Sequence, residues 1–348
     1  MEAVLCDGSA LRYWRTHVDT RVSVTGSGTR LPKRRAHLNV DAPSAATVRD
    51  LRDLRLCGDE TVCLLVGDSS SKRRLKGARV RIISHELPSR SVVRVGGEVY
   101  VVAPELLFLM AAERLSLVEL LELGHELCGT YRMTDPMPTY GVGPLTRVSS
   151  IKSYALKAEG ISGRRRALLA CQYLADGSGS PAESTLSIMF RLPLRYGGYG
   201  LGDPLLNHEI ELNEGASRLL GGQRTIRPDF FWRRAHYPVE YDSTLYHSTK
   251  EENDADERRR NAFAALGMGV TVVRPRHLQD IALLDEIAAS IRKNIGLYVS
   301  RLPANYQETH RKLFEEACRF WIAARKRSLS ERSYVLEAAA YSQPYYPW

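Results

Sequence analysis

Residues 228–242 read PDFFWRRAHYPVEYD, and this stretch predicts two neighbouring β-strands joined by a short turn. Residues 227–232 and 237–241 have the aromatic and β-branched composition of strands, and residues 233–236 form the expected turn between them. Residues 209–213 are expected to supply the first strand of the same meander. The sequence therefore predicts a small antiparallel sheet in this part of the chain.

Helical segments surround these strands in the sequence. The motif SPAE at residues 180–183 predicts a helix start, because a serine followed by proline and then glutamate is typical of a capped helix N-terminus. A second helix is expected over residues 254–266, a fourth strand over 270–273, and further helices over 279–295 and 306–326. This order favours an α/β fold in which helices flank a mixed sheet.

The acidic residues of the two central strands fall on one side of the predicted sheet. Alternate residues of a strand face opposite ways, so Glu240 and Asp242 point together while Val239 and Tyr241 enter the other side. Asp229 opens the preceding strand, and the turn can bring it alongside. Carboxylates that converge at a sheet edge bind Mg²⁺ or Mn²⁺, which prefer oxygen ligands. Such an ion orients a phosphate, stabilises its charge in the transition state and activates water.

The ordered set of motifs in this region resembles the PD-(D/E)XK nucleases, and in particular the DUF559 group related to the very short patch repair endonucleases. The motifs are SPAE at 180–183, PDF at 228–230, VEYD at 239–242 with His247, Asp256 with Arg259, and LG at 266–267. The resemblance covers residues 179–280. It implies a restriction-endonuclease-like fold and Mg²⁺-dependent cleavage of a phosphodiester bond, in DNA rather than in RNA.

By matching position, the resemblance also implies a role for each charged residue. Asp229 and Glu240 would be the metal-side acids, and Glu183 would be the acid on the helix. His247 is similar to a histidine that acts as a base in the short-patch branch, and it would accept a proton from the attacking water. Arg259 is expected to face the site or a phosphate.

Two positions depart from the family pattern. Asp242 occupies the place of the family's lysine and cannot supply its positive charge, so His247 or Lys250 is expected to substitute for that lysine. Ser243 stands where a glycine often follows this acid. The candidate catalytic residues are therefore Glu183, Asp229, Glu240, Asp242 and His247, and the candidate nucleic-acid contacts are Lys250 and Arg259.

Each candidate also has an ordinary structural interpretation. Glu183 can cap its own helix in a capping box with Ser180, a role compatible with a place in the site. Asp229 can be a turn acid, and Glu240 can pair with an arginine across the hairpin. His247 can be a hydrogen-bonded surface histidine. These alternatives stay open at the level of the sequence.

The composition is that of a globular chain with a basic surplus. Hydrophobic residues make up 44% and charged residues 26%, values that exclude wholesale disorder. Lys and Arg number 49 against 40 Asp and Glu, and most of the surplus precedes residue 179, where 26 basic residues face 19 acidic ones. A basic surface releases counterions from a phosphate backbone, so nucleic acid is a reasonable partner, and a merely solvated surface is the alternative. Basic runs at 33–35, 72–74 and 164–166 favour nucleic acid.

The chain before residue 134 predicts a separate mixed α/β domain. The expected elements are strands at 61–66 and 78–83, a hairpin at 92–102, and helices at 105–114 and 116–127. The hairpin and the helix after it are similar to the C-terminal region of AbiEi-type antitoxins, which are often joined to DUF559 nucleases. We expect an N-terminal domain for nucleic-acid or partner recognition over residues 1–133, a helical connection over 134–178, and the nuclease domain over 179–348.

The sequence predicts neither a membrane segment nor an oxidising environment. The longest apolar run, residues 106–112, is far shorter than the roughly 20 residues that a spanning helix needs. The N-terminal residues lack the basic and then apolar pattern of a signal peptide. The six cysteines form no CxxC pair, which argues against a zinc ribbon and for reduced thiols. We expect a cytoplasmic protein.

These observations together predict a metal-dependent endonuclease that acts on DNA, with Mg²⁺ or Mn²⁺ held by Asp229 and Glu240. The alternative is a catalytically inactive nucleic-acid-binding or antitoxin-like regulator that keeps the nuclease fold. A third hypothesis is a protein-interaction module whose acids form ordinary salt bridges, and it predicts no affinity for nucleic acid.

Overall fold

The computed structural model describes residues 1–17, 30–53, 61–243, 250–299 and 301–322, without the side chains of residues 53 and 250–253. The chain forms two compact units. The first comprises residues 1–128 and 142–174, and the second comprises residues 129–141 and those from 175 onward. Both units combine helices with strands, so the predicted α/β class is confirmed.

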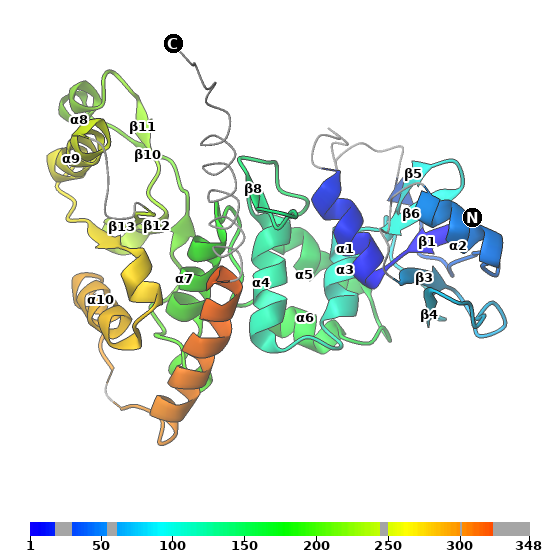
Figure 1. The fold of residues 1–348 in the computed structure, drawn as a ribbon. Helices are drawn as coiled ribbons and strands as arrows, with labels where there is room; N and C mark the ends of the chain where they lie inside the picture. Colours follow the sequence, from blue (N-terminus) through cyan, green and yellow to red (C-terminus); the bar gives the residue numbers. More distant parts are fainter. Residues whose placement is uncertain (18–29, 54–60, 244–249, 300, 323–348) are drawn as a thin grey trace, which may run out of the picture. The chain divides into compact units, whose positions relative to one another are not determined.

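A six-stranded mixed sheet forms the centre of the first unit (Figure 1). Its order is β2-β5-β6-β1-β3-β4, in which β1 runs parallel to β6 and β3 runs parallel to β4. The hairpin predicted at residues 92–102 is confirmed, since β5 and β6 are antiparallel neighbours. The strands are β1 (Ala3–Leu5), β2 (Arg30–Leu31), β3 (Val62–Val66), β4 (Ala78–Ile82), β5 (Val92–Gly96) and β6 (Val99–Val102).

Helices α3 to α6 form a group beside this sheet (Figure 1). The sequence predicted residues 134–178 as a separate helical connection, but α5 and α6 from this range pack on α3 and α4 within the first unit. They do so because their small and apolar residues, such as Ile151, Ala155 and Ala167, are buried. The helices of this unit are α1 (Asp7–Thr16), α2 (Ala45–Asp53), α3 (Pro104–Ala111), α4 (Leu117–Cys128), α5 (Val148–Lys157) and α6 (Arg164–Ala170).

A four-stranded sheet of order β14-β13-β12-β9 forms the centre of the second unit. Strands β9, β12 and β13 form an antiparallel meander, and β14 pairs parallel to β13. The strands predicted at 227–232, 237–241 and 270–273 are confirmed as β12 (Phe230–Trp232), β13 (Tyr237–Tyr241) and β14 (Thr271–Val273). The sequence pattern therefore located three of the four strands of this sheet.

The first strand of the meander was predicted wrongly at residues 209–213. That place belongs to β9 (Leu205–Leu206), whose Leu206 is buried against the sheet. Within the predicted range, β10 (Ile210–Glu211) pairs instead with β11 (Thr225–Ile226) as a two-stranded sheet. The reason is burial: Glu209 and Glu211 are exposed and offer no apolar side chain to the core.

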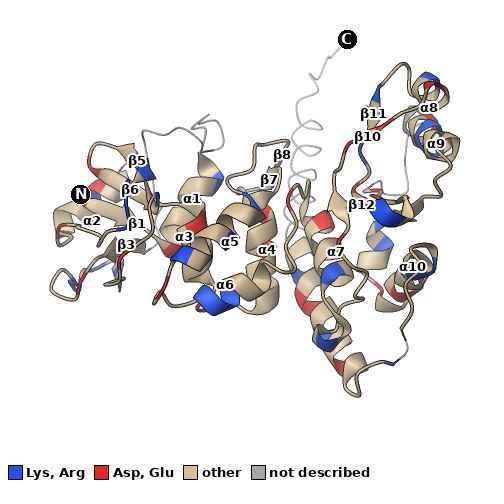
Figure 2. Cartoon of the chain, turned by 180° about the vertical axis from the view of Figure 1, so that it is seen from behind, with Lys and Arg blue, Asp and Glu red and all other residues tan. Residues whose placement is uncertain are grey.

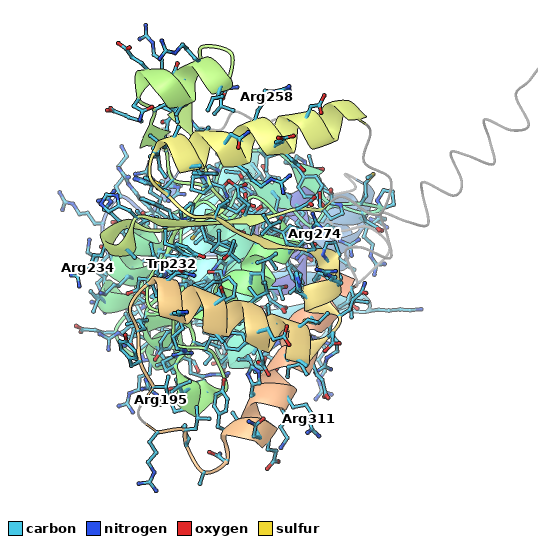
Figure 3. All side chains as sticks on the ribbon, turned by 90° about the vertical axis from the view of Figure 1, so that its left-hand side faces the viewer. Arg195, Trp232, Arg234, Arg258, Arg274 and Arg311 are labelled. Carbon is cyan, nitrogen blue, oxygen red and sulfur yellow. The ribbon has the colours of Figure 1, made fainter. Side chains whose placement is uncertain are left out.

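Helices cover the four-stranded sheet of the second unit. Phe190 of α7 (Pro181–Arg191) lies with its ring 5.4 Å from that of Phe230 and 6.0 Å from that of Trp232. Phe263 of α9 (Lys250–Ala265) is fully buried. The side-on view of Figure 3 places the strands between α9 and α10 (Ile281–Asn294). The remaining elements are β7 (Tyr131–Arg132), β8 (Thr139–Tyr140), α8 (Glu214–Leu219), three short 3₁₀ helices and a helix over residues 306–322.

A search for membrane-spanning helices gave a negative result. Within the described parts of the chain, no helix has both the length and the apolar character that crossing a bilayer requires.

Candidate active site

The β12–β13 hairpin places Asp229 beside Glu240. Phe230 pairs with Val239 in the antiparallel register, so the next pair outward is Asp229 with Glu240. The backbone N–H of Tyr241 donates to Oδ2 of Asp229 at 2.5 Å, which holds this carboxylate against the neighbouring strand. The sequence predicted this convergence, and the structure brings the two acids together at the end of the sheet.

This end of the sheet is the one opposite the β12–β13 turn. Trp232 closes β12 next to the turn, whereas Arg274 directly follows β14, and Figure 3 labels these two residues at opposite ends of the sheet. Asp229 and Glu240 lie at the Arg274 end. We call this end, with Asp229, Glu240 and Asp242, the acidic end of the sheet.

Asn207 joins the acidic end to Glu183. It directly follows β9, and its backbone N–H donates to the carbonyl of Asp229 at 3.1 Å. Its side-chain Nδ2 donates to Oε2 of Glu183 at 2.6 Å and to the carbonyl of Gly177 at 2.9 Å. Asn207 has φ +48°, a left-handed conformation that asparagine tolerates better than most residues. This side chain therefore fixes the carboxyl group of Glu183 near the strand that begins after Asp229.

Glu183 also takes part in the cap of α7, but only half of the predicted capping box forms, because its carboxylate accepts from the N–H of Gly179 and not from that of Ser180. Its backbone N–H donates to Oγ of Ser180 at 3.2 Å, and the Ser180 hydroxyl donates to Oε1 of Glu183 at 2.9 Å. The N–H of Gly179 donates to Oε2 at 2.7 Å. Glu183 is only 8% exposed, so the cap holds a carboxyl group inside the protein. The capping role and a place beside the acidic end therefore coexist.

Burial raises the pKa values of the three acids, and the charge of Asp229 adds to the shift at Glu183 and at Glu240. The pKa of Glu183 is raised to about 7, first by burial and then by the negative charge of Asp229. The pKa of Glu240 is also raised to about 7 by burial, with Arg259 opposing the shift and the charge of Asp229 adding to it. Burial raises the pKa of Asp229 as well. The site thus gathers more negative charge than its surroundings neutralise.

Arg259 of α9 is the cation that faces these acids. Its Nη2 and Nε donate to Oε1 of Glu240 at 2.9 and 3.1 Å, and Nη2 also donates to the carbonyl of Arg227. The Arg259 side chain is 35% exposed while that of Glu240 is 17% exposed, so one part of the guanidinium group reaches the surface. The structure places Arg259 against Glu240, whereas its predicted contact with a phosphate stays a prediction.

The other candidates have different outcomes. Asp242 lies one residue beyond β13 and accepts a hydrogen bond from Nε of Arg274 at 3.2 Å, an ion pair that the sequence did not suggest. His247 lies outside the described residues. Lys250 begins α9, and its side chain is likewise outside the description.

Three residues of this region were not predicted from the sequence. Asn207 follows a two-residue strand that no pattern revealed, and Arg274 was not linked to any acid. Tyr140 of β8 has a raised pKa, mainly from burial and then from the charge of Glu183, so it lies near that carboxyl group. No sequence signal could have found Tyr140, because it comes from a segment 43 residues before Glu183.

The carboxylates at the acidic end do not form a complete set of ligands for a metal ion. Among the side chains that the structure describes, no group of three or more His, Cys, Asp or Glu residues is arranged to hold one metal ion. Comparisons with known proteins gave no match to this chain among family models, curated proteins or solved structures. The geometry of the site is therefore the basis for assigning a function.

Proposed function

We propose that the second unit is a metal-dependent endonuclease that hydrolyses phosphodiester bonds, with DNA as its substrate. The single observation that carries this proposal is the gathering of Glu183, which is buried, with Asp229 and Glu240, which are partly buried, all three with raised pKa values. Such groups are costly to bury and cluster at functional sites. The meander flanked by helices supports the restriction-endonuclease-like fold that the sequence resemblance implies.

The donor chemistry of the acidic end fits Mg²⁺ or Mn²⁺. Asp229 and Glu240 offer carboxylate oxygens, which these hard cations prefer. Mg²⁺ is usually bound through one or two carboxylates, with water and substrate phosphate completing its shell, so two protein ligands suffice. The excess of buried negative charge favours a divalent cation here as well. We propose Asp229 and Glu240 as the residues that would hold it.

The chain's own residues would prepare the reaction in distinct ways. Asn207, Gly179 and Ser180 hold the carboxyl group of Glu183 by three hydrogen bonds, and the backbone N–H of Glu183 donates a fourth to Ser180. Arg259, partly exposed, can donate to a phosphate oxygen while its charge opposes the rise in the pKa of Glu240. A bound divalent ion would supply charge stabilisation for the phosphate and a lower pKa for an attacking water.

Three parts of the proposal rest on the sequence alone. His247 is proposed as the proton acceptor and Lys250 as a phosphate contact, from their matched positions in the nuclease pattern. The cytoplasmic location is likewise proposed from the cysteine pattern.

The direct test is nicking of supercoiled plasmid with Mg²⁺ or Mn²⁺ and with a chelator. Asp229→Asn and Glu240→Gln keep the side-chain shape but remove the charge, and each should lower the nicking rate on the order of 10²- to 10³-fold. The matched control is Glu211→Gln, which neutralises an exposed acid of the same unit and should nick at the wild-type rate. Full nicking by both site variants would contradict the proposal.

A second candidate is a catalytically inactive regulator that binds nucleic acid with the same fold. One observation favours it: Arg259 already occupies Oε1 of Glu240 with two N–H groups, in the manner of a substitute cation. This candidate predicts salt-sensitive binding of DNA without cleavage, unchanged by Asp229→Asn. The nicking assay therefore separates the two.

A further inference from the structure

The loop between β3 and β4 concentrates positive charge in the first unit. Within residues 72–79, KRRLKGAR, five residues are basic and none is acidic. All five side chains, Lys72, Arg73, Arg74, Lys76 and Arg79, are exposed. We call this segment the basic loop; Figure 1 shows it between β3 and β4, and Figure 2 marks basic residues in blue.

The ends of the basic loop are held in place by the fold. Strands β3 and β4 pair over five residues, and the N–H of Val62 donates to the carbonyl of Gly77 at 2.9 Å. Arg52 of α2 donates to the same carbonyl at 3.2 Å. Gly77 has φ +76°, a left-handed conformation that favours glycine at this position. Asp68 turns the chain before the loop by accepting from Ser71 N–H at 2.8 Å.

The cations of the basic loop have no acidic partners. None of the five forms an ion pair with an acidic side chain in the part of the chain that the structure describes. Other exposed arginines of the same unit do have such partners, as Arg35 has Glu86 and Arg94 has Glu98. The basic loop therefore keeps its charge available for a ligand.

The same residues also line a hollow. Lys72 to Lys76, with Ala78, Arg79 and Val80, surround a volume of about 530 Å³. A concave surface lined by one sign of charge concentrates counter-ions of the opposite sign. Guanidinium groups match phosphate oxygens in pairs, and three of the five cations are arginines. The ligand class that this chemistry favours is a phosphate or a chain of phosphates.

We propose that the basic loop is a docking site for the phosphate backbone of nucleic acid, separate from the acidic end of the second unit. An anionic membrane is the other surface rich in phosphate, but membrane contacts combine basic residues with exposed apolar ones. The exposed large apolar side chains among the described residues, such as Leu156 and Tyr298, lie outside the loop. The inference does not depend on the proposed nuclease activity.

An ordinary explanation for the charge exists, and the test must exclude it. Strand β4 is an edge strand, and lysine and arginine on edge strands prevent pairing with other chains. That role predicts that neutralising the loop promotes aggregation and leaves binding of DNA unchanged.

The experiment compares two triple variants with equal loss of charge in the same unit. Lys72→Gln/Arg73→Gln/Arg74→Gln removes part of the basic loop, and Arg147→Gln/Lys152→Gln/Lys157→Gln removes three exposed cations in and directly before α5. Binding of a short fluorescent DNA duplex of random sequence is measured with chelator present, over roughly 50 to 200 mM salt. Circular dichroism confirms that both variants are folded.

The loop variant should bind the duplex at least about tenfold more weakly at the lower salt concentration. The slope of the logarithm of its binding constant against the logarithm of the salt concentration should become smaller by about 2 to 3, since each lost phosphate contact removes about 0.9. The control variant should bind within about twofold of the wild type. Equal binding by both variants, equal loss in both, or no binding by the wild type would overturn the inference. Loop-dependent binding to phosphatidylglycerol vesicles without binding to the duplex would overturn it too. Because chelator excludes cleavage, none of these outcomes depends on the nicking assay.

Discussion

The acidic end of the second unit and the basic loop of the first unit both concentrate charge, but they differ in burial. Glu183 is buried and Glu240 is mostly buried, and this burial, together with the charge of Asp229, raises their pKa values to about 7. Lys72, Arg73 and Arg74 lie in water, where like charges repel each other weakly. Burial of the acids lowers the free energy of unfolding, whereas the exposed cations of the basic loop lower it little. Burial rather than charge count is therefore what marks the candidate active site.

The largest expected effect is a pH dependence of stability that belongs to the second unit. The folded pKa values of Glu183 and Glu240, about 7, exceed the ordinary value of 4.5, so in this window the folded chain binds protons that the unfolded chain has released. The free energy of unfolding should fall as the pH rises from about 4.5 to 7 and then level off, by about 3 kcal/mol for each of the two groups. Urea unfolding at about pH 5 and about pH 8, followed by pulse proteolysis with fragments assigned to each unit, measures it.

The control for this pH dependence of the free energy of unfolding is the double variant Glu183→Gln/Glu240→Gln. It has no carboxyl group to titrate at these two positions, so its second unit should lose most of the difference between the two pH values. An undiminished difference in the double variant would show that other groups cause the pH dependence.

The next prediction compares two variants, one that lacks an arginine at the acidic end of the sheet and one that lacks an arginine in the basic loop. Arg259→Ala leaves the mostly buried Glu240 without its cation and should lower the free energy of unfolding by about 2 kcal/mol at neutral pH. This loss is smaller than the loss expected for a fully buried ion pair, because Arg259 is partly exposed. Arg73→Ala should change it by less than about 0.5 kcal/mol, since the side chain is exposed and has no acidic partner among the described residues. Urea unfolding of the two variants measures both values, and similar losses would remove the proposed difference between the regions.

The smallest effect is a gain in stability at the site. Asp229→Asn removes a buried charge beside Glu183 and Glu240, while its side-chain oxygen can still accept from the N–H of Tyr241. The variant should be more stable than the wild type by about 1 kcal/mol at about pH 8, although we expect it to lose nicking activity. Urea unfolding at this pH is the measurement. A loss of stability would mean that Asp229 has a structural role that outweighs the repulsion.

The local elements near the site were predictable because their signals are local. The alternation in PVEY and the aromatic run in FFW located β13 and β12, and SPAE located the start of α7. The strand β9 was missed because two leucines give no periodic pattern. Its neighbour Asn207 was missed with it, and so was the hydrogen bond that holds Glu183.

Ion pairing was less predictable than the elements, because it depends on how segments far apart in the chain pack. The partner of Glu240 is Arg259 on α9 rather than an arginine of the hairpin, and Asp242 pairs with Arg274 after β14. The helical segment at 148–170 was predicted as helix but was assigned to a connection, because the pattern of buried residues does not say which sheet they cover.

The order of acids along the chain, the strand alternation and the excess of basic residues follow from the amino-acid sequence alone, since each depends on neighbours within a few residues. Only the tertiary structure decides that Asn207 reaches Glu183, that Arg259 faces Glu240, and that the cations of the basic loop pair with no acid among the described residues. The physical reason is that burial and the distance between charges set the energy of a charged group, and both arise only when distant segments pack together.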